Sequence, residues 1–283
     1  MIKNFDLSTW TCFSERRNSK SYMSADKKWM VKFGTEFAKA TMESLEREKD
    51  LTDKALAIGV KTPKVGDIVE LPNGELGLIY QYIEGKKSIA RAMGEDIDNI
   101  DYYMKRFAHI AKDMHSKTCD VNKFESMEER VREQIKKLKE LNDAQKEKAL
   151  KLIDGIEKKN NCLLGDFQTG NFIMTGDEEF VIDLGAIAYG NPDYDIASFY
   201  FFCYYFPPYV TDRLFHCEPK YLPVMWESFI KHYFDTTDEK VIKELNDKYA
   251  KYALVCFMGM LKFVESGPEI QDAMDKNFDR LFG

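Results

Sequence analysis

A polar loop followed by two short apolar strands constrains this chain more than any other part of its sequence. The loop runs from Gly165 to Asn171, strands are predicted at 172–174 and 180–182, and Asp183 follows the second strand. The residues between them, 175–179, include a glycine and an aspartate, which favour a five-residue hairpin loop. The pattern predicts a β-hairpin with polar side chains at its open end.

In such a hairpin Asn171 faces Asp183, because directly opposed residues have Cβ atoms about 4.5–5.5 Å apart. Asp166 lies five residues before Asn171. Carboxylate and carboxamide oxygens suit Mg²⁺, which takes one or two protein ligands and leaves its other positions to phosphate and water. Taken separately, Asp183 is explained as a strand cap and Asn171 as a turn residue. Taken together with Asp166, they favour a catalytic loop followed by a metal-holding hairpin.

Composition excludes several classes of protein. No run of eighteen apolar residues is present, and the N-terminus lacks the apolar stretch of a signal peptide. Six cysteines are spread without a Cys-x-x-Cys pair, as expected for reduced thiols. The net charge of −7 argues against nucleic acid as a partner. We expect a cytoplasmic protein that binds neither membranes nor nucleic acid.

The order of the patterns predicts an α+β fold with two lobes. Alternation over 27–33 places Val31 and Phe33 on one face of a strand and Lys32 on the other. A helix is expected over 37–58, and strands over 65–70 and 76–83 are joined through an Asn-Gly hairpin signal. After about residue 84 the periodicity becomes helical. The predicted domains are a β-rich lobe, 1–84, and a mainly helical lobe, 85–283.

Two charged residues stand out in the first lobe. Glu48 lies three positions from Leu45 and from Leu51, so it falls on the apolar stripe of the predicted helix. An unpaired buried carboxylate is costly, and Lys32 on the preceding strand is the natural partner. The alternative is that Glu48 lies at the edge of the stripe and points to water. By contrast, His109 and His115 of the helix near 100–114 are interpreted as ordinary surface or core residues.

Several segments, in order, resemble one family. Five segments resemble the aminoglycoside phosphotransferase and choline kinase superfamily. They are Glu46-Arg47-Glu48-Lys49-Asp50 in the helix, Tyr80-Gln81-Tyr82-Ile83-Glu84-Gly85, the loop 165–171, Ile182-Asp183-Leu184-Gly185, and Gly190 to Ala197. This superfamily is the small-molecule branch of the protein-kinase-like fold. The resemblance extends over roughly residues 10–205.

The resemblance implies a role for each site residue in the catalytic loop and hairpin. Asp166 would be the catalytic carboxylate that orients the acceptor hydroxyl and takes its proton. Asn171 and Asp183 would hold Mg²⁺ against the phosphates of the nucleotide. Asp195 would brace the catalytic loop rather than react.

The resemblance also implies a nucleotide site for ATP, with GTP as the alternative donor. Lys32 would contact the α- and β-phosphates and Glu48 would steady it. Backbone groups of Gln81, Tyr82 and Ile83 would bind the adenine edge as a hinge.

Two positions depart from the family pattern. The family usually has His where this chain has Leu164, so we expect a loss of order in the catalytic loop. The first hairpin, 14–22, contains no glycine, although a loop that covers phosphates usually needs glycine for close backbone approach. Ser19 and Ser21 are the candidates to donate hydrogen bonds there instead.

The acceptor is open at this stage. The aromatic run 199–209 suits either a cage for a quaternary ammonium or a buried helix, and nearby acids suit either a cationic sugar or solvent. The resemblance predicts a kinase for the hydroxyl of a small molecule, aminoglycoside-, choline- or sugar-like. The alternative is a catalytically weakened nucleotide-binding homologue with a regulatory role. A protein kinase is disfavoured, because a Gly-rich loop and an Ala-Pro-Glu segment are both missing.

Overall fold

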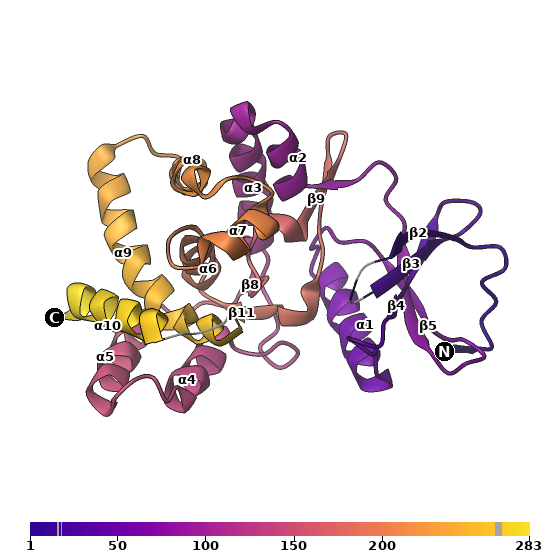
Figure 1. The fold of residues 1–283 in the computed structure, drawn as a ribbon, viewed down its shortest axis with the longest axis horizontal. Coiled ribbons are helices and arrows are strands. Elements are labelled where there is room, and N and C mark those ends of the chain that lie inside the picture. Colours follow the sequence, from indigo (N-terminus) through magenta and orange to yellow (C-terminus); the bar gives the residue numbers. More distant parts are fainter. Residues whose placement is uncertain (16, 18, 264–267) are drawn as a thin grey trace. The chain divides into compact units, whose positions relative to one another are not determined.

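The computed structural model describes residues 1–15, 17, 19–263 and 268–283. The chain forms two compact units (Figure 1). The first contains Met1–Lys87 and Ile173–Gly185, and the second contains Ser88–Phe172 and Ala186–Gly283. The hairpin that follows the polar loop thus belongs with the β-rich unit, whereas the predicted division at 84/85 placed it in the helical one.

A six-stranded sheet forms the body of the first unit, in the order β1-β5-β6-β4-β3-β2. The short β1 is parallel to β5, and the other neighbours are antiparallel. The Asn-Gly signal is confirmed, since Gly74 adopts φ +84° between β5 and β6. The strands are β1 (Ile2–Lys3), β2 (Thr11–Glu15), β3 (Ser19–Met23), β4 (Trp29–Gly34), β5 (Val65–Glu70) and β6 (Leu76–Gln81).

The two faces of this sheet carry separate apolar clusters. Val31, Phe33 and Val69 pack on one face. On the other face Leu78 and Ile68 pack against Leu45 of helix α1 (Met42–Ala57). Lys32 lies opposite Leu78 on the neighbouring strand and so belongs to the face that α1 covers. The predicted alternation of this strand is confirmed.

Helix α1 begins five residues later than predicted. Thr41 caps it, and a reciprocal bond from Ser44 completes a capping box, which satisfies backbone N–H groups at the first turn. Phe37, the predicted start, is 63% exposed. The predicted stop is supported by Gly59, which adopts φ +86° just beyond the helix.

The predicted hairpin exists, but its loop is shorter than expected. Strand β9 (Phe172–Thr175) and strand β10 (Glu178–Val181) leave two residues between them, so the five-residue loop is wrong. With β7 (Lys87–Ser88) they form a three-stranded sheet in the order β10-β9-β7. Ile173 and Phe180 of the hairpin pack with Ile83.

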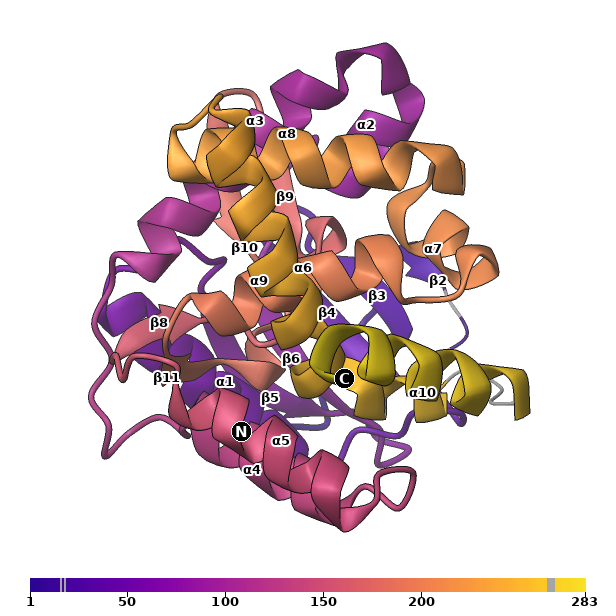
Figure 2. The same ribbon diagram turned by 90° about the vertical axis from the view of Figure 1, so that its left-hand side faces the viewer.

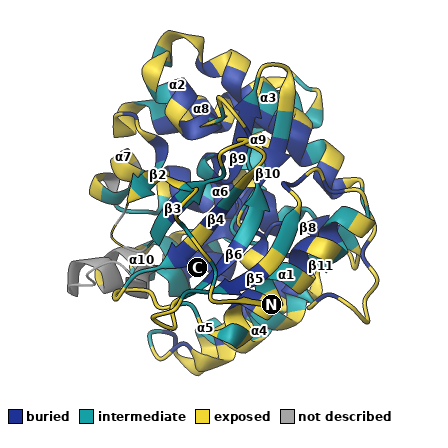
Figure 3. Ribbon diagram, turned by 90° about the vertical axis from the view of Figure 1, so that its right-hand side faces the viewer, coloured by how far each residue is buried: buried dark blue, intermediate teal, exposed yellow. Residues whose placement is uncertain are grey.

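The second unit is mainly helical, which confirms the predicted α+β class. Two helices rich in charged residues, α4 and α5, bury only positions four residues apart, Met127, Val131 and Ile135 in α4 and Ala149 and Ile153 in α5. Their other positions are half-buried or exposed (Figure 3). The helices are α2 (Ile89–Glu95), α3 (Ile100–His115), α4 (Met127–Lys137), α5 (Asp143–Asp154), α6 (Asp193–Tyr204), α7 (Pro208–Phe215), α8 (Leu222–Phe234), α9 (Glu239–Phe257) and α10 (Pro268–Phe282).

Helix α6 lies at the centre of this unit and packs on both α8 and α9 (Figure 2). Phe199, Phe201 and Phe202 of α6 are buried, so the first part of the aromatic run is core. Tyr204 at its end is 43% exposed and stacks on Tyr200, with ring centroids 4.5 Å apart. Among the described residues, no helix is both long and apolar enough to cross a membrane.

A short antiparallel ribbon leads into the predicted catalytic loop. Strand β8 (Asn161–Leu163) pairs with β11 (Ala188–Gly190), so Leu163 lies opposite Ala188. The predicted catalytic loop starts directly after β8. The two ends of the ribbon therefore lead into this loop and into α6.

Candidate active site

The loop that carries Asp166 has a backbone that only glycine suits at its first position. Gly165 adopts φ +81°, and a Cβ atom there would lie 2.3 Å from the carbonyl oxygen of Ala186. The chain therefore turns sharply after β8. Beyond this turn Asp166 is half-buried and Phe167 is fully buried in the core.

Asp166 and Asn171 are held together inside this loop. The Asn171 Nδ2 group donates to the Asp166 carbonyl oxygen and to its Oδ2, both at 2.9 Å. Both bonds use the nitrogen of the carboxamide, and no described residue donates to Asn171 Oδ1. The side chain of Gln168 stabilises the turn between them by accepting from the Gly170 N–H at 2.9 Å.

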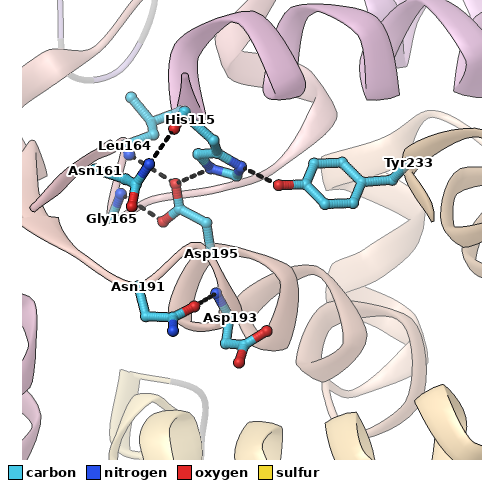
Figure 4. Close-up of polar contacts among 8 residues, drawn as sticks. All are labelled: His115, Asn161, Leu164, Gly165, Asn191, Asp193, Asp195 and Tyr233. Atoms are coloured by element: carbon cyan, nitrogen blue, oxygen red, sulfur yellow. Dashed lines mark hydrogen bonds and ion pairs between the residues drawn. The ribbon is translucent and has the colours of Figure 1, made fainter. Parts of the chain in front are cut away.

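Asp195 fixes the entry to this loop, as expected from the resemblance (Figure 4). Its Oδ2 accepts from the Leu164 N–H at 2.7 Å, and its Oδ1 accepts from the Gly165 N–H at 2.9 Å. The Asp195 side chain is completely buried. A carboxylate in that position satisfies two backbone donors that water does not reach.

Asp183 lies in the first unit in a different kind of environment. It is exposed and adopts φ +61°, a left-handed conformation that few residues other than glycine tolerate and that clusters at functional sites. No described residue forms a hydrogen bond or an ion pair with its carboxylate. Arg47 of α1 donates to the Gly185 carbonyl oxygen at 2.8 Å and holds the segment just beyond it.

The oxygen atoms of Asn171 and Asp183 fit a divalent cation chemically. Asn171 Oδ1 and the Asp183 carboxylate are hard donors without protein partners among the described residues. Asn171 belongs to the second unit and Asp183 to the first. Their joint ligation of Mg²⁺ therefore stays a prediction.

Glu48 has a different partner from the one predicted. Its carboxylate accepts a hydrogen bond from the hydroxyl of Tyr80. No ion pair joins Lys32 to Glu48 among the described residues; Lys32 is exposed on β4. Burial and the nearby carboxylates of Glu48 and Asp183 raise the pKa of Tyr80 well above its usual value. Tyr80 therefore stays a neutral phenol that can donate to Glu48.

The predicted hinge has one backbone donor without a protein acceptor. The Gln81 N–H donates to the Lys64 carbonyl at 2.7 Å, and the Tyr82 N–H donates to the Lys28 carbonyl at 2.8 Å. Among the described residues, no acceptor contacts the Ile83 N–H. The structure thus singles out Ile83 from the three hinge residues.

Ser19 and Ser21 lie on β3, between β4 and the edge strand β2. Ser21 is buried and lies opposite Lys32, whereas Ser19 is half-buried and lies opposite Gly34. Arg16 and Asn18 of this hairpin lie outside the described residues. Ser21 therefore shares a face of the sheet with Lys32, and Ser19 belongs to the same face by alternation.

Sequence reasoning missed three residues that organise the site. Tyr80 holds Glu48, Arg47 holds Gly185, and His115 contacts Asp195 through Nε2 at 3.1 Å. A signal for His115 was present, because it follows Phe107 and Ala111 at helical spacing and thus lies on the buried stripe of α3. The same argument that drew attention to Glu48 applies to it.

Comparison with known proteins identifies the family. The sequence model of the phosphotransferase enzyme family matches residues 14–216, most of the chain. The chain therefore belongs to this family, and the expected class of enzyme, a small-molecule kinase, is confirmed. Among curated protein sequences, none matches it significantly.

Solved structures share the fold at low sequence identity. A thermostable mutant of aminoglycoside phosphotransferase APH(4)-Ia, in ternary complex with ADP and hygromycin B, is 10% identical; the match covers 98% of this chain and 95% of that one, with a TM-score of 0.62. Amicoumacin kinase hAmiN in complex with AMP-PNP, Ca²⁺ and Ami is 14% identical over 99% and 90%, with a TM-score of 0.53. A choline/ethanolamine kinase family protein from Mesorhizobium loti is 11% identical over 96% and 86%, with a TM-score of 0.51. These likenesses confirm the predicted kinase-like fold.

Proposed function

We propose that this protein transfers the γ-phosphoryl group of ATP, with Mg²⁺, to a hydroxyl group of a small molecule. The arrangement of Asp166 and Asn171 carries the proposal. Asn171 fixes the orientation of the Asp166 carboxylate through Nδ2, and its Oδ1 is left to coordinate a metal ion. The nitrogen of this carboxamide thus orients the acid, and its oxygen remains available to coordinate a metal ion, as phosphoryl transfer requires.

The residues of the loop and hairpin take separate roles in this reaction. Asp166 orients the acceptor hydroxyl and accepts its proton as the oxygen attacks phosphorus. Asn171 Oδ1 and the Asp183 carboxylate hold Mg²⁺. The ion, when bound, neutralises charge on the phosphate oxygens. Asp195 keeps the loop in place and does not touch the reacting atoms.

The nucleotide is assigned to the sheet of the first unit. Lys32 supplies a positive charge for the phosphates, and Ser19 and Ser21 supply hydrogen bonds from the same face. Glu48 lies on the helix that covers this face, where the hydroxyl of Tyr80 holds its carboxylate. Among the hinge residues, the Ile83 N–H is the donor for the base edge, next to backbone groups of Gln81 and Tyr82. ATP is the preferred donor and GTP the alternative, since the solved relatives include complexes with ADP and AMP-PNP as well as with GDP.

The acceptor is proposed as a small hydroxyl compound, aminoglycoside-, choline- or sugar-like. Two of the structural relatives bind hygromycin B and amicoumacin, respectively, and another belongs to the choline/ethanolamine kinase family. The net charge of −7 agrees with a cationic acceptor. The predicted cytoplasmic location would give the enzyme its nucleotide.

The experiment separates nucleotide binding from turnover. Thermal stabilisation by Mg-ATP and by Mg-GTP is measured first, followed by nucleotide consumption over a panel of aminoglycosides, choline, ethanolamine, sugars and nucleosides. We expect stabilisation by Mg-ATP and acceptor-dependent consumption that Asp166→Asn abolishes. Asp177→Asn, an exposed aspartate in the hairpin loop, is the matched control and should retain full activity.

The alternative function has its own outcome in the same experiment. Leu164 and the glycine-free hairpin favour a nucleotide-binding homologue with weakened catalysis. Binding of Mg-ATP without turnover on any acceptor would support that alternative. Absence of nucleotide binding would overturn both functions.

A further inference from the structure

A buried histidine is linked to the predicted catalytic loop in two ways, through Asp195 and through Phe167. His115 is the last residue of α3 and is 4% exposed. Both of its ring nitrogens have partners: Nε2 lies 3.1 Å from Asp195 Oδ2, and Nδ1 lies 2.8 Å from the Tyr233 hydroxyl (Figure 4). A side chain this buried and this fully bonded has a fixed orientation.

The first interaction reaches the residues before Asp166. The same Asp195 oxygen that contacts His115 accepts the Leu164 N–H, and the other oxygen accepts the Gly165 N–H. His115 therefore fixes the carboxylate that holds the loop entry. Leu164 contributes only a backbone group to this network, so the polar side chain beside the loop comes from α3.

The second interaction reaches the residue after Asp166. The His115 ring stacks on Phe167, with centroids 5.5 Å apart and planes inclined by 29°. Phe167 is completely buried and also stacks on Phe107 at 4.8 Å. One imidazole thus contacts Phe167 directly, after Asp166, and reaches Leu164 and Gly165, before Asp166, through Asp195.

The two partners of His115 place different demands on its ring nitrogens. The Asp195 carboxylate can only accept a hydrogen bond, so Nε2 carries the hydrogen atom that it donates to Oδ2. The Tyr233 hydroxyl, which can donate or accept, occupies Nδ1 at 2.8 Å. Asp195 then accepts three N–H groups, from Leu164, Gly165 and His115.

We propose that His115 is a positioning residue of the phosphoryl-transfer reaction, which holds residues 164–167 so that the Asp166 carboxylate keeps its orientation toward the acceptor hydroxyl. The proposal rests on the proposed role of Asp166. It assigns to α3 the support that a histidine at position 164 would give in the family pattern.

The main test removes the hydrogen bonds of His115 but keeps an aromatic ring on Phe167. In His115→Phe we expect kcat to fall about 10- to 100-fold while the KM for ATP changes less than about twofold, because loop misplacement affects the chemical step. His115→Gln places an amide donor near Asp195 and should recover part of kcat. His109→Phe, on the exposed side of the same helix, should behave like the unchanged protein.

Amide hydrogen exchange gives a readout that needs no turnover. The peptide containing Leu164 and Gly165 should exchange faster in His115→Phe, whereas peptides of β5 and β6 should not change. If the unchanged protein shows no turnover but this exchange difference is found, the proposed function fails and the contact of His115 with the loop stands. Unchanged kcat together with unchanged exchange would overturn the inference.

A second variant covers the case in which His115→Phe does not fold. Tyr233→Phe removes only the bond to Nδ1 and should lower kcat by a few-fold, again with little change in the KM for ATP. A fall in thermal stability without any fall in kcat, in either variant, would mean that His115 is structural only and would also overturn the inference.

Discussion

The two acidic residues proposed for the active site are held in opposite ways. Asp166 lies in a loop whose neighbours are buried: Leu164 and Phe167 are completely inaccessible, and Asp195 accepts the backbone N–H groups of Leu164 and Gly165. Asp183 is exposed, adopts a left-handed backbone, and has its main support beyond it, at Gly185. One acid is positioned by a core and the other by a strained turn.

This difference agrees with what each residue is proposed to do. A proton acceptor must keep one orientation toward its hydroxyl, so fixing its neighbours in a core favours the reaction. A ligand for Mg²⁺ gains its partner when the ion binds, so a carboxylate without protein partners suits that role. Changes at the two sites should therefore have different consequences for stability and for activity.

The largest expected effect is a loss of kcat in variants of the two acids, and raised Mg²⁺ should restore activity only in the Asp183 variant. Asp166→Asn should lower kcat by about 10²- to 10⁴-fold at any Mg²⁺ concentration, because no carboxylate remains to accept the proton. Asp183→Asn should also be severely impaired but should recover partly as Mg²⁺ is raised. Mg²⁺ titrations of ATP consumption make the comparison. Identical Mg²⁺ dependence of the two variants would contradict the division of roles.

The next effect concerns the support of Asp166. Asp195→Ala leaves the N–H groups of Leu164 and Gly165 and the ring of His115 without their shared acceptor in a dry interior. We expect a loss of about 3 to 5 kcal/mol in the free energy of unfolding. Urea denaturation measures it, with Asp177→Ala as an exposed control that should change by less than about 0.5 kcal/mol. A loss below about 1 kcal/mol would mean that Asp195 does not brace the loop.

Gly165 and Gly176 separate the cost of a left-handed backbone from the additional cost of steric overlap in a packed site. Both adopt positive φ, +81° at Gly165 and +54° at Gly176, but only Gly165 faces a backbone oxygen at 2.3 Å; nothing lies within 4 Å of a Cβ at Gly176. Gly176→Ala should cost roughly 1–2 kcal/mol for the left-handed backbone. Gly165→Ala should cost roughly 2–5 kcal/mol, because overlap adds to that penalty. Equal losses in urea denaturation would mean that the loop relaxes freely.

The smallest effect concerns Tyr80, between Glu48 and Asp183. Its pKa in the folded protein is raised above the usual value of 10, so above pH 10 the unfolded chain loses the phenolic proton before the folded chain does. The stability that this group contributes is fully present below pH 10 and is lost as the pH rises toward the raised pKa. Tyr80→Phe should flatten the decline of unfolding free energy between pH 10 and 11. Tyr209→Phe, an exposed ring, serves as the control and should leave the slope unchanged.

Some features of the site were predictable because they are local. Gly165 to Asn171 form one loop, so the sequence spacing already placed Asp166 beside Asn171. The turn at Gly74 and the stripe of α3 follow equally from short-range rules. The start of α1 and the length of the hairpin loop were wrong, since capping by Thr41 and continued pairing to Thr175 outweighed the hydrophobic pattern.

The sequence by itself therefore determined the kinase-like α+β class, the family and the loop that holds Asp166 and Asn171. Each of these depends on residues that are close in the chain or on motifs in fixed order. The tertiary structure decided which side chains from distant parts of the chain bind the polar residues of the site. Glu48 is bound by Tyr80, 32 residues away, and Asp195 contacts His115, 80 residues away. Such pairs form only when separate helices and strands pack, and no periodicity within one element specifies which polar group from another element will meet it.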